Sequence, residues 1–424
     1  MRYITILIAI TFHLSIMGDA FYERSPIDYE NGKEDNEVVR LQKKLDSGLN
    51  LDYDSQHGYL NAVLKALNIP VSSQTLVFSK TSFHRKLIST HNPRAIYFNK
   101  NTYIGWVDGA RVLEVGVADK NLGAVFYTFT QSKTEKPKFV RDDSCLSCHA
   151  SGRTQNEPGF FIRSVFPDKD GEPVSRAGED RVDHTTPIDL RWGGWFVTAD
   201  NFNSPHRGNG YVKKDGPYKV SPVSAKSLND LSNFFDSEKY LTSTSDIQAL
   251  MALEHQVKMH NLFTTTKFRS LHALHNEKVI NEALGETGRR DLTKRILNNA
   301  ATEILDYMLY ENEISLKGNE FSGIEKFRQD FASMAPRDSK GRSLAELTFD
   351  RKMGKFSCSW LIYCDSFLGL PVELKEIVLQ RLIKILTGEI IPDKYIHVRK
   401  SRDEIHAILL ETHADYKAQF EASK

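Results

Sequence analysis

The five residues Cys145-Leu-Ser-Cys-His149 constrain this chain more than any other segment. In the Cys-x-x-Cys-His pattern the two thiols form thioether bonds to the vinyl groups of a haem, and the adjacent histidine is placed to ligate the iron. The chain has 4 cysteines in 424 residues, so a shuffled chain would contain the pattern with a probability on the order of 0.001. We therefore predict one covalently attached haem c, with His149 as an iron ligand.

Two other interpretations of the motif stay open. A zinc ion held by Cys145, Cys148 and His149 needs a fourth ligand, and the remaining cysteines, Cys358 and Cys364, are distant in the sequence. A disulfide between Cys145 and Cys148 closes too small a loop to stabilise much. If the segment around Cys358 and Cys364 is helical, these two residues are separated by a rise of about 9 Å, too far for a disulfide. They are expected to be buried thiols in a core helix.

The N-terminus has the pattern of a secretory signal peptide. Met1 and Arg2 precede an apolar stretch over 3–17, and small residues occupy the −3 and −1 positions of a cleavage site after Ala20. The apolar run is interrupted by His13 and is shorter than the roughly 20 residues that span a bilayer. Because haem c is assembled on the outer side of the bacterial inner membrane, this signal and the haem motif support each other. The mature protein is expected to be periplasmic or secreted.

Composition narrows the function classes. The chain is 40% hydrophobic and 26% charged, with a formal net charge of +1, so neither a basic excess nor a Lys/Arg tract favours nucleic acid. No segment after the signal is long and apolar enough to span a membrane. The length suggests about two or three domains.

Hydrophobic periodicity predicts an α+β fold. Residues 36–67 are helix-like with a turn-rich interruption, and short β-rich runs separated by turns then predict an antiparallel meander. A loop-rich segment over 151–223 contains one hairpin signal, and long 3.6-period segments follow, the first with a Ser245-x-x-Gln248 capping box. The strands are expected at 75–78, 94–98, 103–107, 111–117 and 123–129, and the late helices at 246–284, 290–312, 322–333, 372–387 and 402–420. The expected divisions are a signal peptide (1–20), a helix plus antiparallel β part (21–140), a haem c segment with loops and a hairpin (141–224), and an α-helical part (225–424).

The second iron ligand is expected to be a histidine, because no methionine occurs between His149 and Met251. His184, His206 and His255 are the candidates. His255 shares a helical stripe with methionines 251 and 259, whereas His260 lies about 140° away around that helix. We favour His255, with a hydrogen-bonded core histidine as the alternative.

An aromatic cluster, Arg191-Trp-Gly-Gly-Trp-Phe196, is the densest near the motif. Trp192 is expected to pack on the porphyrin and Arg191 to pair with a haem propionate. A core strand with a glycine bulge is the alternative. Weaker propionate candidates are Arg141, Arg153 and Arg163. If the iron has an open position, Arg191, His184 and His206 are the candidate catalytic residues.

The chain resembles a group of large exported bacterial proteins that carry one cytochrome c motif and have no assigned reaction. The resemblance implies haem binding and electron transfer, and it strengthens the candidacy of His184, Arg191, His206, His255 and His260. The di-haem peroxidases differ, since they carry two such motifs. The runs that carry the resemblance are residues 58–62, 70–81, 93–98, 145–149, 191–195, 206–209, 254–256, 259–261 and 358–363.

These observations rank three functions. The first is an exported c-type cytochrome that transfers electrons to or from an extracytoplasmic redox partner protein, with protein ligands on both sides of the iron. The second is a haem-dependent redox enzyme, peroxidase-like, with an open or displaceable distal site. The third is a secreted zinc or disulfide-bearing interaction module.

Overall fold

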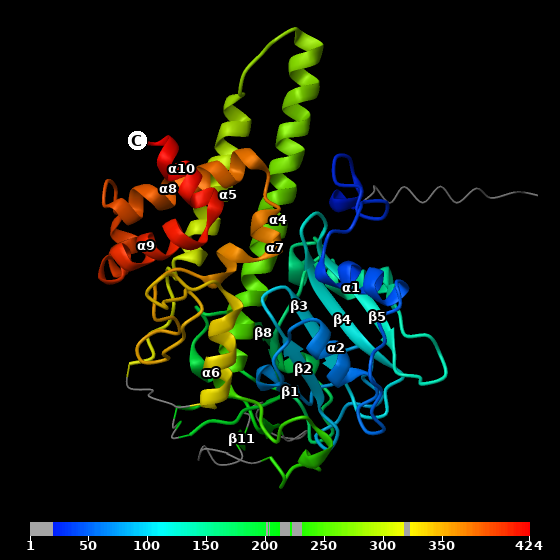
Figure 1. The fold of residues 1–424 in the computed structure, drawn as a ribbon. Coiled ribbons are helices and arrows are strands. Elements are labelled where there is room, and N and C mark those ends of the chain that lie inside the picture. Colours follow the sequence, from blue (N-terminus) through cyan, green and yellow to red (C-terminus); the bar gives the residue numbers. More distant parts are fainter. Residues whose placement is uncertain (1–19, 201, 203, 213–220, 223–230, 318–322) are drawn as a thin grey trace, which may run out of the picture.

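The computed structural model describes residues 20–200, 202, 204–212, 221–222, 231–317 and 323–424. The signal peptide predicted over 1–20 therefore lies, apart from Ala20, outside the described residues. The fold class is α+β, as predicted: a mostly antiparallel sheet forms the N-terminal part and helices form the C-terminal part (Figure 1). None of the helices in the described ranges is both long and apolar enough to cross a membrane.

A seven-stranded sheet organises the N-terminal half. Its order is β6-β5-β4-β3-β2-β1-β9, and all neighbours pair antiparallel. The predicted meander is confirmed, and β9 from the loop-rich segment adds an edge strand. The strands are β1 Thr75–Val77, β2 Arg94–Phe98, β3 Thr102–Trp106, β4 Val112–Asp119, β5 Gly123–Thr130, β6 Phe139–Arg141 and β9 Trp195–Phe196; two small hairpins pair β7 Arg163–Val165 with β8 Glu179–Arg181 and β10 Gly210–Tyr211 with β11 Ser221–Pro222.

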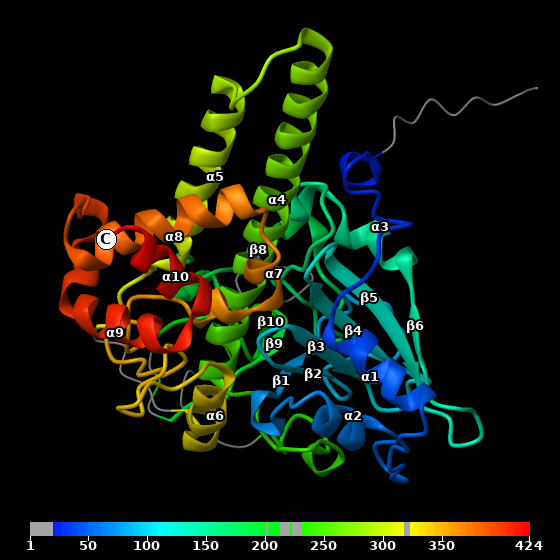
Figure 2. The same cartoon turned by 45° about the horizontal axis from the view of Figure 1, so that its top comes forward.

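Side chains alternate between the two faces of each strand, and the faces bury different partners. Tyr97, Ile104 and Val115 lie on one face, in a hydrophobic cluster with α1 (Glu37–Asp46) and α2 (Leu60–Ala66). Tyr103 and Phe126 lie on the other face, in a cluster with the central helix α4. Figure 2 shows the sheet between these two layers.

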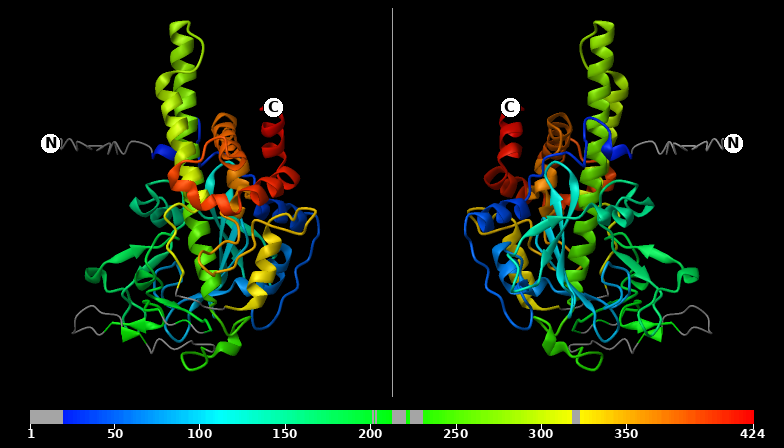
Figure 3. Two further views of the ribbon diagram at one scale, coloured as in Figure 1. Left: turned by 90° about the vertical axis from the view of Figure 1, so that its left-hand side faces the viewer. Right: turned by 90° about the vertical axis from the view of Figure 1, so that its right-hand side faces the viewer.

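The long segments predicted to be helical form helices. α4 spans 38 residues and packs antiparallel against α5, and the two project as a hairpin beyond the rest of the molecule (Figure 3). The predicted helix over 402–420 is interrupted at His413, whose backbone is extended and whose side chain caps the next helix. The helices are α3 Leu146–His149, α4 Ile247–Leu284, α5 Asp291–Met308, α6 Glu325–Phe331, α7 Asp365–Leu368, α8 Val372–Thr387, α9 Arg402–Thr412 and α10 Ala414–Ala422.

The start of α4 differs from the predicted capping box by one residue. Asp246 is the N-cap, and its side chain accepts hydrogen bonds from the backbone N–H groups of residues 248 and 249. The Ser245 hydroxyl instead bridges two strands: it accepts from Leu76 N at 2.9 Å and donates to Phe196 O at 2.7 Å. Ser245 therefore ties β9 to β1 rather than capping the helix.

The prediction for the second cysteine pair holds in part. Cys358 and Cys364 are fully buried free thiols. They flank a 3-10 helix at Trp360–Tyr363 and do not lie within a core α-helix, because the serine at 359 caps this short turn.

Ser245→Ala is expected to lower the free energy of unfolding by about 1–3 kcal/mol, because a buried N–H and a buried carbonyl lose their common partner. Urea unfolding of the two proteins measures the change. Ser423→Ala is the matched control, since its hydroxyl donates only to an exposed carbonyl near the C-terminus. Equal stability of the parent and the Ser245 variant would contradict the bridging role.

Candidate functional site

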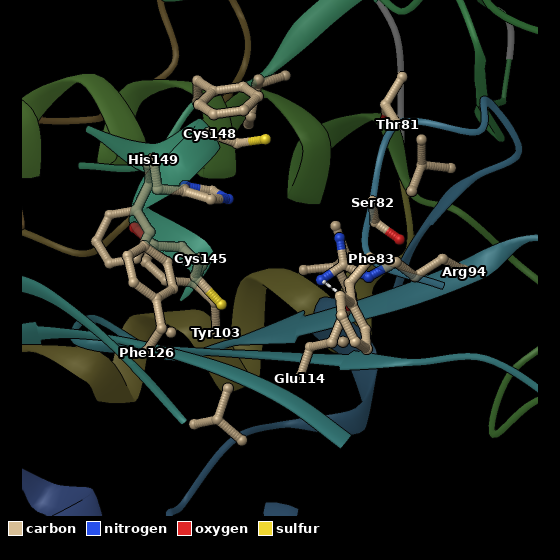
Figure 4. Close-up of a pocket in the computed structure, with 18 of the residues that line it drawn as sticks. Thr81, Ser82, Phe83, Arg94, Tyr103, Glu114, Phe126, Cys145, Cys148 and His149 are labelled. Carbon is tan, nitrogen blue, oxygen red and sulfur yellow. Dashed lines mark ion pairs between the residues drawn. The ribbon is translucent and has the colours of Figure 1, made fainter. Parts of the chain in front are cut away.

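A cavity of about 510 Å³ lies against the Cys-x-x-Cys-His motif. Its volume falls in the range of small-molecule and cofactor sites. Figure 4 shows the motif on one side of the cavity and residues of the sheet and of the segment before β2 on the other. Side chains of Leu253 and Val257 from α4 close it.

The floor of the cavity is one face of the sheet. Residues two apart on each strand share that face, and the floor positions follow this rule on four neighbouring strands. Two of them are glycines, and neighbouring side chains fill the space above them: a Cβ on Gly116 would lie 2.9 Å from Phe160 Cε1. The floor residues are Arg94 and Ile96, Tyr103 and Gly105, Glu114 and Gly116, and Phe126 and Thr128.

The motif is presented by a short helical turn. The Asp142 side chain accepts from Ser144 N and starts a 3-10 helix over Asp143–Cys145, which continues into α3. In a helical turn, residues three and four apart lie on one face. Cys145, Cys148 and His149 therefore point the same way, and Figure 4 shows both sulfur atoms and the imidazole on one wall of the cavity.

His149 is held in the form that ligates metals. Its Nδ1 lies 2.8 Å from Gly159 O, and because a carbonyl only accepts, Nδ1 carries the proton and Nε2 has a free lone pair. Burial lowers the pKa of His149 to about 4, so the ring is neutral. The ring packs between Phe126 and Phe161, with centroids at 4.5 and 4.7 Å. A neutral imidazole oriented by a carbonyl is the usual arrangement of a metal-ligating histidine.

Both thiols of the motif are free, with Cys148 exposed and Cys145 partly buried. Burial raises the pKa of the Cys145 thiol to about 12. Within the described ranges, no group of three or more His, Cys, Asp or Glu side chains is arranged to hold a metal ion. Among the described residues there is thus no fourth ligand for the zinc interpretation, and Cys145 and Cys148 are not joined by a disulfide.

The rim of the cavity is basic and includes one exposed aromatic ring. Arg153 and Arg163 line the rim, and both pair with Glu179, at 2.8 and 2.6 Å. Their position at the rim agrees with the propionate contacts predicted for these two arginines. Arg141 does not line the cavity and pairs with Asp143 at 2.8 Å. Phe83 lines the rim with 73% of its surface exposed, an apolar face that a bound flat group would cover.

His255 lies on the other side of α4 from the cavity. It is two residues from both Leu253 and Val257, about 200° around the helix from each. Its Nδ1 is 2.8 Å from His184 Nδ1, and its Nε2 is 2.8 Å from Ser359 Oγ. Both histidines are buried, and Tyr307 stacks on His184 with centroids 3.9 Å apart. Neither His184 nor His255 lines the cavity.

The predicted cofactor contacts Arg191 and Trp192 also lie outside the cavity. Arg191 and Glu254 form a fully buried ion pair at 2.7 Å. Trp192 packs against Phe202 and His206, with centroids at 6.0 and 5.3 Å. The neighbouring Trp195 lines the cavity instead, and its Nε1 donates to a backbone carbonyl at 2.9 Å.

The remaining candidate, His260, is one side chain removed from the cavity. Its Nδ1 bonds the Tyr103 hydroxyl at 2.8 Å, and Tyr103 lines the cavity floor. The geometry thus places Cys145, Cys148, His149, Arg153 and Arg163 together. It gives no support to the haem roles predicted for Arg191, Trp192, His184, His206 and His255, which stay predictions.

Sequence patterns did not single out a charged group on the cavity floor. Arg94 Nη2 lies 2.5 Å from Glu114 Oε2, and His84 Nδ1 lies 3.3 Å from Glu114 Oε1. The available signal was an acidic residue in the middle of an otherwise apolar strand, Val112–Asp119, where a buried carboxylate requires a partner.

Comparisons with protein-family models, with curated proteins and with solved structures find no match for this chain. The resemblance to exported mono-haem proteins therefore remains a prediction.

Arg191→Met is expected to destabilise the protein more at pH 8 than at pH 5. Burial raises the pKa of the Glu254 carboxyl to about 7, although the charge of Arg191 opposes this rise. The stability that this carboxyl contributes is therefore largest below its pKa in the unfolded state, and it is lost as the pH rises through 7. Without Arg191 the charged form is unpaired, which costs about 3–5 kcal/mol at pH 8.

Urea unfolding at the two pH values measures this difference, which should be at least about 1.4 kcal/mol, the equivalent of one pKa unit. The double variant Arg191→Met, Glu254→Gln is the control and should lose the added pH dependence. An equal destabilisation at both pH values would show that the ion pair is not the cause.

Proposed function

We propose that this chain is an exported c-type haem protein, with one haem attached to Cys145 and Cys148 and ligated by His149. The observation that carries the proposal is the cavity against the motif, into which both thiols and the neutral imidazole point from one wall. The orientation of His149 by Gly159 O gives independent support, since such a bond fixes the tautomer needed for ligation.

The residues present fit a haem. Apolar side chains on the floor and from α4 suit the porphyrin body, and the basic rim suits its two carboxylates. A bound haem supplies one-electron chemistry at iron. The protein's part is to hold His149, to exclude water with Phe126, Phe160 and Phe161, and to set the polarity around the iron.

The lining of the cavity favours the enzyme class over the carrier class. Among the described residues that line it, His149 is the sole histidine, and methionine is absent. A carrier with two protein ligands requires such a side chain opposite His149. We therefore propose a haem-dependent redox enzyme with an open iron position, which exchanges electrons with an extracytoplasmic redox partner protein in the periplasm or outside the cell.

Replacing Cys145 and Cys148 by Ala is expected to abolish covalent haem attachment in cells that express a haem c assembly system. Haem staining of a denaturing gel measures it. Cys358→Ala is the matched control, because that thiol is buried away from the cavity, and it should retain full staining. A parent protein without covalent haem would overturn the proposed function.

The ferric protein is expected to be mainly high-spin, because the described residues that line the cavity include no methionine and no histidine besides His149. Electron paramagnetic resonance of the purified holoprotein measures the spin state. His255→Asn should leave the spectrum unchanged. A low-spin parent that becomes high-spin in His255→Asn would establish His255 as the second ligand and contradict the open position.

A further inference from the structure

The part of the cavity floor that lies across from the motif carries a cluster of charged side chains. Arg94 from β2 and Glu114 from β4 line the cavity there, and His84, from the segment before β2, pairs with Glu114 without lining the cavity. Their side chains are 21%, 16% and 11% exposed. Figure 4 shows Arg94 and Glu114 across the cavity from His149. A mostly buried cation paired with a mostly buried carboxylate requires an explanation, because burying charges is costly.

A glycine determines how Arg94 lies. Gly105 on β3 pairs with Glu114 on β4 in the sheet register. A Cβ on Gly105 would lie 2.6 Å from Arg94 Nε and 2.8 Å from Cζ. The guanidinium thus crosses directly over the backbone of the intervening strand to reach Glu114. Any larger residue at 105 would displace it.

The group has unused hydrogen-bonding capacity. Arg94 Nε and Ser82 Oγ are buried and have no hydrogen-bond partner among the described residues. Both residues line the cavity. Buried donors of this kind are rare in native structures unless something binds them. Two donors and a carboxylate at the far wall are suited to a small ligand that accepts hydrogen bonds and carries a proton.

The carboxylate is in the form that accepts a proton. Burial alone would raise the pKa of the Glu114 carboxyl, but the charge of Arg94 and the hydrogen bond from His84 outweigh burial and lower that pKa below its ordinary value. Arg94 remains able to stabilise negative charge that develops on a bound oxygen.

Building on the proposed function, we propose that Arg94 and Glu114 are catalytic residues for the reduction of hydrogen peroxide by the haem-loaded protein, and that His84 and Gly105 are positioning residues. With a haem bound, Glu114 would accept a proton from one peroxide oxygen and return it to the other. The second oxygen would then leave as water when the O–O bond breaks, and Arg94 would stabilise the negative charge that develops on it.

The overall reaction consumes two electrons and two protons per peroxide and releases two waters. The electrons come singly from a reduced one-electron carrier protein, two molecules of which are oxidised. Peroxide fits this wall because breaking its O–O bond requires both a proton transfer between the two oxygens and a cation beside the one that departs.

The test uses the ferric holoprotein with Arg94→Lys and Glu114→Gln variants, and Glu303→Gln as the matched control. Glu303 also pairs with an arginine, Arg269, but neither of these two residues lines the cavity. Azide titration followed by absorbance is the first readout. Arg94→Lys should weaken azide binding by about 10- to 100-fold, the effect of losing a charge-assisted hydrogen bond, and Glu303→Gln should not.

The second readout is the bimolecular rate of reaction with hydrogen peroxide in a stopped-flow instrument. Glu114→Gln should lower it at least about 100-fold, as removal of a general base does, with covalent haem content unchanged. Gly105→Ala should resemble Arg94→Lys, because it displaces the same guanidinium.

Three results would overturn this proposal while leaving covalent haem attachment intact. In the first, both variants bind azide and react with peroxide as the parent does. In the second, the ferric parent is low-spin and becomes high-spin in His84→Ala, which would make His84 an iron ligand. In the third, nitrite and not peroxide oxidises the reduced protein in a reaction that depends on Glu114. A parent without haem would instead overturn the proposed function itself.

Discussion

The packing of α4 between the sheet and the C-terminal helices is the constraint on which the rest of the structure depends. The first two thirds of this helix are almost entirely buried. No face of this part of the helix is mainly solvent-exposed, and each face packs against a different part of the protein. Leu253 and Val257 close the cavity toward the motif, whereas Glu254 and His255 face a buried polar cluster. One helix thus separates the cavity beside the motif from a charged core, and each requires its own complement of partners.

The two walls of the cavity have complementary chemistry. The motif wall provides two thiols and a neutral imidazole, all on one helical face. The sheet wall provides Arg94 and Glu114, aligned because alternate residues on neighbouring strands share a face. Gly105 and Gly116 let the Arg94 guanidinium and the Phe160 ring lie directly against the sheet. A flat group attached to the motif would therefore have a protein ligand on one side and a charged pair on the other.

Local patterns predicted the elements well, and relative placement poorly. The strands from Thr75 to Thr130 and the late helices lie close to where periodicity and turn residues put them, because those signals act within a few residues. The helix that carries the stripe of Met251, His255 and Met259 was also predicted, and the structure buries this stripe. Because α4 is buried on all sides, its sequence has no polar face from which the orientation of the helix could be predicted. The sequence therefore could not show whether this stripe faces the cavity.

The sequence by itself determined the Cys-x-x-Cys-His motif, the α+β class and the antiparallel succession of the five predicted strands, since each depends on spacing along the chain. Only the tertiary structure decided which polar groups face the motif. Glu114 lies 31 residues before Cys145 and Arg94 lies 51 before it, and the strand register brings both across the cavity. Arg191, which is nearer to Cys145 in sequence than Arg94 is, pairs instead with Glu254. Strand pairing and the burial of charge are long-range terms, and no local pattern encodes their outcome.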